Sequence, residues 1–114
     1  MLFGLDEVRG YLDRGGLAVF QPDITRLGGL TPTLKAITLA ESRGVPVAPH
    51  LLPEVCVQLG CGLQPVTLVE FMPWHAALFA NAPRPERGRI KPPDGPGLGL
   101  VLDAEAVARW RVAF

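Results

Sequence analysis

The 114-residue sequence has no excess of either charge, no long apolar run and only two cysteines. Eleven basic residues balance eleven acidic ones, and no basic run is longer than two residues, so neither a nucleic acid nor an anionic membrane is expected as a partner. No apolar run approaches the roughly 20 residues of a membrane span, and the charged first fifteen residues do not form a signal peptide. We therefore expect a cytoplasmic protein.

The two cysteines, Cys56 and Cys61, are too few for a disulfide scaffold. They also do not predict a zinc site, because no second pair of cysteine or histidine residues stands at ligand spacing. We expect two buried or half-buried thiols without a metal.

What the sequence does contain is a globular composition with a strand and helix rhythm. Hydrophobic residues make up 48% and charged residues 19%, which is typical of a folded chain. Three runs read as strands, residues 17–23, 45–50 and 66–71, and in the first the apolar residues are consecutive, as in buried parallel strands. Helical or turn-rich segments separate the runs, so the pattern predicts an α/β fold with a parallel sheet.

Helix signals flank these strands. Leu5, Val8 and Leu12 form an apolar stripe that Gly15 would terminate, and Thr31 with Pro32 is a typical helix start. Further helices are predicted from Pro53 and over residues 104–110, and residues 83–99 are expected to be extended and rich in turns. In the last helix we expect Val107 and Trp110 to lie in the core.

Each strand-like run ends on or near an ionisable residue, namely Asp23, His50 and Glu70. Each has an ordinary alternative role. Asp23 could cap the turn that follows it, and His50 could be a structural histidine. Glu70 is harder to explain as structure, since a carboxylate in an apolar strand is costly unless it is paired or functional.

Taken together, the three residues indicate a catalytic site. The carboxyl ends of parallel strands meet at one edge of the sheet, where the active sites of (β/α) barrels lie. Neighbouring strands are roughly 4.8 Å apart, which places Asp23 within reach of His50. A carboxylate that orients an imidazole makes a general base, and Glu70 could accept or donate a hydrogen bond beside it.

Three segments, FQPDITRLGGLTPTLKAITLAESRGVPVAPH, VEFMPW and KPPDGPGLGLVLD, closely resemble the C-terminal third of the mandelate racemase/muconate lactonizing enzyme-like proteins of the enolase superfamily. The resemblance is to the mandelate racemase branch. It implies a partial TIM (β/α) barrel with about the last three strands, the sixth to the eighth, their helices and a C-terminal extension. Residues 1–114 would then be a C-terminal fragment of the barrel domain, without the capping domain and the first five strands.

The resemblance also implies roles. Asp23 and His50 would form a histidine–aspartate dyad with His50 as the base, and Glu70 would hydrogen-bond the carboxylate of the substrate. The complete enzyme would use magnesium to abstract the proton alpha to a carboxylate of a hydroxy acid or sugar acid. Acid-sugar dehydratase is the first choice for this lyase or isomerase, and racemase or epimerase is the second.

Two weaker candidates for the substrate pocket are Arg26 and Trp74, although a loop contact and an aromatic plug are alternative roles. The acidic metal ligands of the family have no counterpart in this sequence, so we expect the isolated chain to bind no magnesium and to be inactive. The alternative function is a non-catalytic (β/α) fragment that acts as an oligomerising or interaction module. Either way, we expect a homo-oligomer or association through open sheet edges.

Overall fold

Three extended segments lie side by side in parallel and position the candidate site. The computed structural model describes residues 2–113. Residues 45–50 form the middle segment, because Val47 pairs in parallel with Phe20 on one side and with Val66 on the other. Backbone hydrogen bonds of 2.9 Å from Ala48 to Phe20 and 2.7 Å from Val47 to Pro65 fix this order. The predicted parallel pairing is therefore confirmed.

The pairing consists of isolated bridges and not of long ladders. Prolines explain this, because Pro22, Pro46, Pro49 and Pro65 lie within or beside the paired residues and cannot donate a backbone hydrogen bond. The prediction of continuously buried strands is wrong in detail. Phe20, Val47 and Val66 are buried, whereas other apolar residues of the outer segments are exposed.

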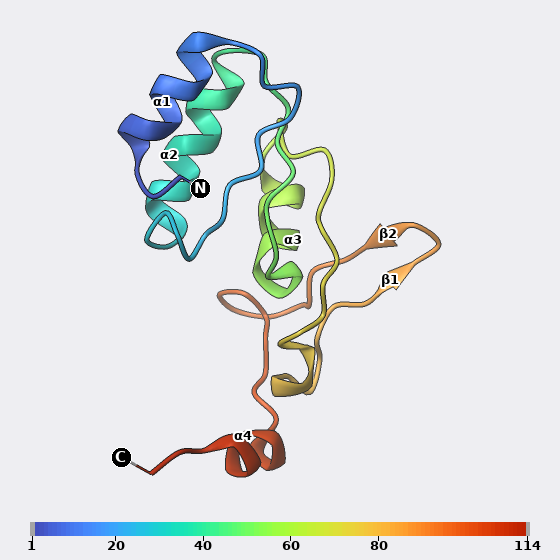
Figure 1. The fold of residues 1–114 in the computed structure, drawn as a ribbon. Helices are drawn as coiled ribbons and strands as arrows, with labels where there is room; N and C mark the ends of the chain where they lie inside the picture. Colours follow the sequence, from blue (N-terminus) through green and yellow to red (C-terminus); the bar gives the residue numbers. More distant parts are fainter. Residues whose placement is uncertain (1, 114) are drawn as a thin grey trace.

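Helices α1 (Leu5–Arg14) and α2 (Leu30–Glu41) pack against each other on one side of these segments (Figure 1). Helix α1 begins with acidic residues and ends at Gly15, whose φ of 71° suits glycine, as predicted. Helix α2 begins two residues earlier than predicted, because Gly29 and not Thr31 is its N-cap. The ends of the pair are tied by an ion pair of 2.5 Å between Asp13 and Arg43.

Helix α3 (Pro53–Gly62) begins at its proline, as predicted, and lies between the α1–α2 pair and the C-terminal part (Figure 1). Its buried residues complete a core to which the helices and the extended segments contribute. That core comprises Val8, Leu12, Phe20, Ile24, Leu27, Ala36, Ile37, Ala40, Val47, Cys56, Leu59 and Val66.

The C-terminal part, from residue 72 onward, is more extended than the part that holds the core. It contains a 3-10 turn, η1 (Ala76–Leu78), a short antiparallel hairpin of β1 (Pro85–Glu86) and β2 (Arg89–Ile90), and helix α4 (Ala104–Trp110). The Asp103 side chain caps α4 by accepting from the Ala106 amide at 2.8 Å.

The expectation that Val107 and Trp110 lie in the core is wrong, because they are 40% and 52% exposed. Helix α4 stands at the far end of the molecule and packs beside η1, away from the α1–α2 pair, so much of its apolar side stays exposed (Figure 1).

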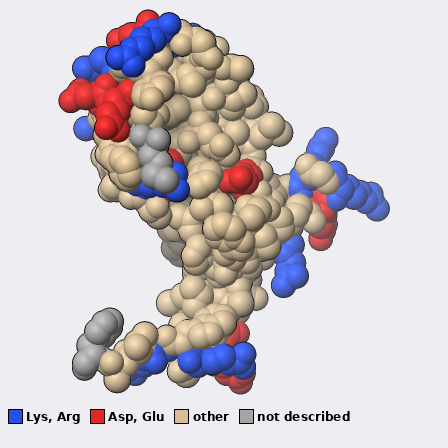
Figure 2. Space-filling view, viewed as in Figure 1, with Lys and Arg blue, Asp and Glu red and all other residues tan. Residues whose placement is uncertain are grey.

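The overall shape is elongated, with principal extents of 48, 39 and 23 Å. Its radius of gyration, 15.4 Å, exceeds the roughly 13 Å of a compact domain of about this length. Figure 2 shows charged side chains mainly at the α1–α2 end, on the hairpin and around α4, with a mostly uncharged surface between them. Among the described residues, no helix has the length and apolar character needed to cross a membrane.

Candidate active site

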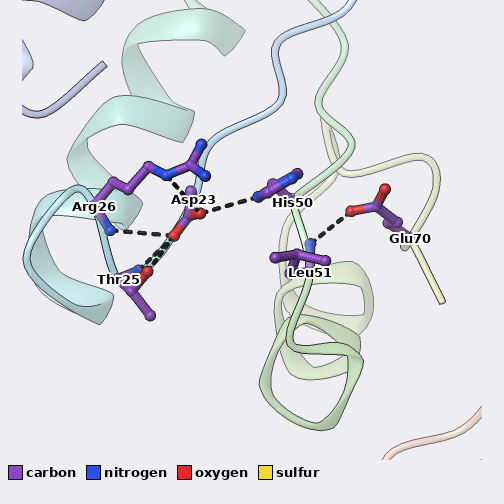
Figure 3. A network of polar contacts seen from close by, with 6 residues as sticks. All are labelled: Asp23, Thr25, Arg26, His50, Leu51 and Glu70. Atoms are coloured by element: carbon purple, nitrogen blue, oxygen red, sulfur yellow. Dashed lines mark hydrogen bonds and ion pairs between the residues drawn. The ribbon is translucent and has the colours of Figure 1, made fainter. Parts of the chain in front are cut away.

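Asp23 is the centre of the candidate site and uses its two carboxylate oxygens differently (Figure 3). Oδ1 faces the following turn, where it accepts from the Thr25 amide at 2.9 Å, the Thr25 hydroxyl at 2.6 Å and the Arg26 amide at 3.1 Å. Oδ2 faces the neighbouring extended segment and lies 2.9 Å from Nδ1 of His50. The capping role and the catalytic role considered for Asp23 therefore coexist in one side chain.

The backbone brings Asp23 and His50 together. The two residues form a parallel bridge, and the His50 amide donates to the Pro22 carbonyl at 2.8 Å. Because a carboxylate accepts only, the contact assigns the imidazole proton to Nδ1 and leaves the lone pair of Nε2 free. The His50 side chain is 25% exposed, so a small molecule can reach it.

The surroundings of Asp23 keep it ionised. Burial on its own would raise its pKa, but hydrogen bonds from the Thr25 hydroxyl, His50 and the backbone amides of Arg26 and Thr25 outweigh this effect. They lower the pKa from 3.8 to about 2. At neutral pH the carboxylate is therefore charged, and it stabilises an imidazolium formed when His50 takes a proton.

Arg26 belongs to the same cluster. Its Nε lies 3.2 Å from Oδ2 of Asp23, and its side chain is 34% exposed. The guanidinium carries further N–H donors, of which those not engaged with Asp23 can bind a carboxylate or hydroxyl group.

Glu70 lies on the other side of His50 (Figure 3). Its Oε2 accepts a hydrogen bond of 2.7 Å from the Leu51 amide, the first amide after His50. Glu70 is half-buried and not enclosed in a buried strand, and neighbouring Leu68 is 69% exposed. The sequence left open whether this carboxylate is paired or functional, and the structure gives it one partner, the Leu51 backbone amide.

Three features near the site escaped the sequence analysis. Thr25 was not singled out, although an aspartate side chain commonly accepts from the backbone two residues on, and that signal could have pointed to it. The left-handed backbone of Leu51 and Leu52, with φ of 55° and 47°, has no signal in these residue types. Glu54 is 2% exposed, its Oε2 has no hydrogen-bond partner among residues 2–113, and helical position alone does not reveal that.

Trp74 stands apart from this cluster. It is 65% exposed, in the turn that follows the third extended segment. Within residues 2–113, the polar contacts join Arg26 but not Trp74 to Asp23. A role of Trp74 in the substrate pocket stays a prediction.

The described residues do not fit a magnesium site. In the range 2–113, no group of three or more His, Cys, Asp or Glu side chains is placed to hold a metal ion. Of the two carboxylates beside His50, Asp23 uses both oxygens for the turn and His50, and Glu70 uses Oε2 for Leu51. What these residues can do themselves is move a proton and hold a carboxylate.

The cysteines take no part in this site. Cys56 is buried, and burial together with the carboxylates of Asp23, Glu54 and Glu70 raises its pKa to about 12. Cys61 is exposed, which corrects the expectation that both thiols are at least half-buried. Cys56 is therefore not an activated nucleophile, which would need a thiol with a lowered pKa.

Curated relatives of the chain include acid-sugar dehydratases. The chain is 30% identical to a D-galactonate dehydratase of Ralstonia nicotianae, over 93% of the chain and 32% of that protein. It is 36% identical to the L-talarate/galactarate dehydratase of Salmonella typhimurium, over 79% of the chain and 22% of that protein. The chain thus spans about a third or less of the length of these relatives.

Solved structures give the same result. The L-talarate dehydratase of Polaromonas sp., crystallised with Mg and L-glucarate, superposes with a TM-score of 0.86 and 34% identity. The match covers 95% of this chain and 29% of that one. The enolase C-terminal domain-like family, which has a TIM-barrel-type α/β fold, matches residues 1–107. The chain therefore belongs to the enolase C-terminal domain-like family, among the mandelate racemase/muconate lactonizing enzyme-like members of the enolase superfamily.

Proposed function

We propose that this chain is the C-terminal part of an acid-sugar dehydratase, in which His50 removes the proton alpha to the substrate carboxylate. The observation that carries the proposal is the 2.9 Å contact between Nδ1 of His50 and the carboxylate of Asp23. Nε2 then faces the substrate as the general base, and Asp23 stabilises the imidazolium that forms.

The other residues of the cluster have roles in binding. Glu70 uses Oε2 for the Leu51 amide, so Oε1 is the oxygen left to contact the substrate. Arg26 supplies a cationic donor beside Asp23, which suits a carboxylate or hydroxyl of a sugar acid. Trp74 lines the outer pocket in this proposal, where its exposed ring can cover apolar parts of a ligand.

The three extended segments are, in this proposal, the sixth to eighth strands of a barrel, and residues 1–114 are a fragment of that domain. The elongated shape and the outward-facing apolar residues of the outer segments, Val19 and Leu68, support this placement. Magnesium is then held by residues outside this chain and supplies charge stabilisation to the substrate carboxylate. The names of the relatives support sugar acids as the substrate class and dehydration over racemisation.

The test measures the rate at which the complete barrel enzyme dehydrates D-galactonate, L-talarate and galactarate. We expect dehydration of at least one of these acids, and in His50→Asn we expect its rate to fall by about 100-fold or more. His75→Asn is the matched control, because His75 is the other histidine and is exposed. Dehydration by His50→Asn at the rate of the control would overturn the proposal.

A second candidate function is an interaction module, which the exposed outer edges favour. Val19 is 49% and Leu68 69% exposed on segments that pair on one side. This function predicts a defined homo-oligomer of the 114-residue chain with a cooperative melt. Size-exclusion chromatography with light scattering would contradict it by showing a monomer over a wide concentration range.

A further inference from the structure

The turn between His50 and helix α3 has an unusual backbone. Leu51 and Leu52 both adopt left-handed φ values, 55° and 47°, which cost non-glycine residues free energy. Pro53 disfavours the right-handed helical region for Leu52, but it favours extended backbone there and does not account for the left-handed values. Leu52 still serves the helix, because its carbonyl accepts from the Val55 and Cys56 amides at 2.9 Å.

Something must hold this strained turn, and the structure shows two contacts. On one side of the turn, the His50 amide donates to the Pro22 carbonyl at 2.8 Å. On the other side, the Leu51 amide donates to Oε2 of Glu70 at 2.7 Å. The first contact is ordinary strand pairing, whereas the second is the short, charge-assisted bond of a carboxylate from the third extended segment (Figure 3).

We propose that Glu70 is a positioning residue for His50, holding through the Leu51 amide the left-handed turn that aims the imidazole at its substrate. The inference rests on the proposed function, in which His50 is the base. It gives Glu70 a positioning role in addition to its contact with the substrate. The two carboxylate oxygens have different roles, because Oε2 accepts from the Leu51 amide and Oε1 remains for a ligand. Loss of Glu70 then impairs the base even before any substrate is bound.

The direct test uses the unsubstituted 114-residue chain labelled for NMR. The expected result is a through-hydrogen-bond coupling between the Leu51 amide nitrogen and the side-chain carboxyl carbon of Glu70. Absence of that coupling, with couplings across the Ala48–Phe20 bond detected in the same sample, would overturn the proposal.

Variants test the effect on His50. In Glu70→Ala, amide hydrogen exchange at Leu51 should accelerate about tenfold or more, while the Ala48 amide keeps its protection. The ring nitrogen shifts of His50 should move from a single Nδ1–H tautomer toward a mixture. Glu70→Gln retains a carbonyl oxygen and should keep both features, and Glu41→Ala, at an exposed site at the end of α2, is the control.

A rescue separates positioning from general stability. Glycine adopts positive φ without strain, so the double variant Glu70→Ala with Leu51→Gly should regain the His50 tautomer without regaining the carboxylate. An unchanged His50 tautomer in Glu70→Ala contradicts the proposal, as does a double variant that fails to regain it. These readouts need no substrate, so their failure is distinct from a failure of the proposed dehydration.

Discussion

Asp23→Asn tests the electrostatics of the site most fully. The substitution keeps the shape of the side chain and an oxygen for the Thr25 turn, but it removes the charge. The ordinary pKa of an aspartate is 3.8, and its surroundings in the folded chain lower that of Asp23 to about 2. At about 1.4 kcal/mol per pKa unit, that difference is worth about 2 kcal/mol of the free energy of unfolding.

The sign of the pH dependence follows from the lowered pKa. The stabilisation is fully present above the unfolded value of 3.8 and is lost as the pH falls through about 2. The free energy of unfolding of the wild-type chain should therefore exceed that of Asp23→Asn by about 2 kcal/mol at pH 6 and by less than about 1 kcal/mol at pH 2.5. For Asp94→Asn, at an exposed loop position, the difference in unfolding free energy from the wild-type chain should not change between pH 6 and pH 2.5.

Two assays measure these effects. Urea unfolding between pH 2.5 and pH 6 gives the free-energy difference, and ¹⁵N NMR of the imidazole gives the tautomer. Because an asparagine amide donates where the carboxylate accepts, Asp23→Asn should move the His50 proton from Nδ1 to Nε2. A free-energy difference that is constant with pH, or an unchanged His50 tautomer, would refute the reasoning.

Three further predictions concern the surroundings of the site. Thr25→Val removes the 2.6 Å hydroxyl donor, so it should raise the Asp23 pKa toward 3.8 and lower the free energy of unfolding by about 1 kcal/mol. A ¹³C NMR titration measures the pKa, and Thr38→Val is the exposed control. An unchanged Asp23 pKa would contradict the prediction. Gly99→Ala places a Cβ against the Pro93 carbonyl and should destabilise the chain by about 1–3 kcal/mol. Gly97→Ala is the control, because Gly97 also has a positive φ but has open space around its Cβ position. Equal melting temperatures of the two variants would contradict the close contact at Gly99. A thiol reagent at pH 8 should modify Cys61 in the folded chain and Cys56 only after unfolding, so mass spectrometry showing both thiols modified at equal rates would contradict the burial of Cys56.

The sequence predicts the parts of this fold that depend on local signals. Gly15 ends α1, Pro53 begins α3 and Asp103 caps α4 because each residue type has a backbone or side-chain reason to be there. Parallel pairing could also be predicted, since alternation of strands with helices allows few other arrangements. Asp23 and His50 follow from that pairing, because both stand where neighbouring segments end.

What the sequence does not reveal is which surfaces meet. The apolar side of α4 predicted a buried Val107 and Trp110, but periodicity identifies a face and not its partner. In the same way, the apolar run at residues 66–71 predicted a buried strand, whereas Leu68 is 69% exposed. The Glu70–Leu51 bond depends on a left-handed turn that no residue type in it announces.

Proton exchange at the alpha carbon of a sugar acid tests the central claim most directly. The complete barrel enzyme would be incubated with its acid substrate in deuterated water, and deuterium at the alpha carbon of recovered substrate would be measured against time. The account predicts exchange from one face that disappears in His50→Asn and persists in His75→Asn. Undiminished exchange in His50→Asn would show that the Asp23–His50 pair is not the base.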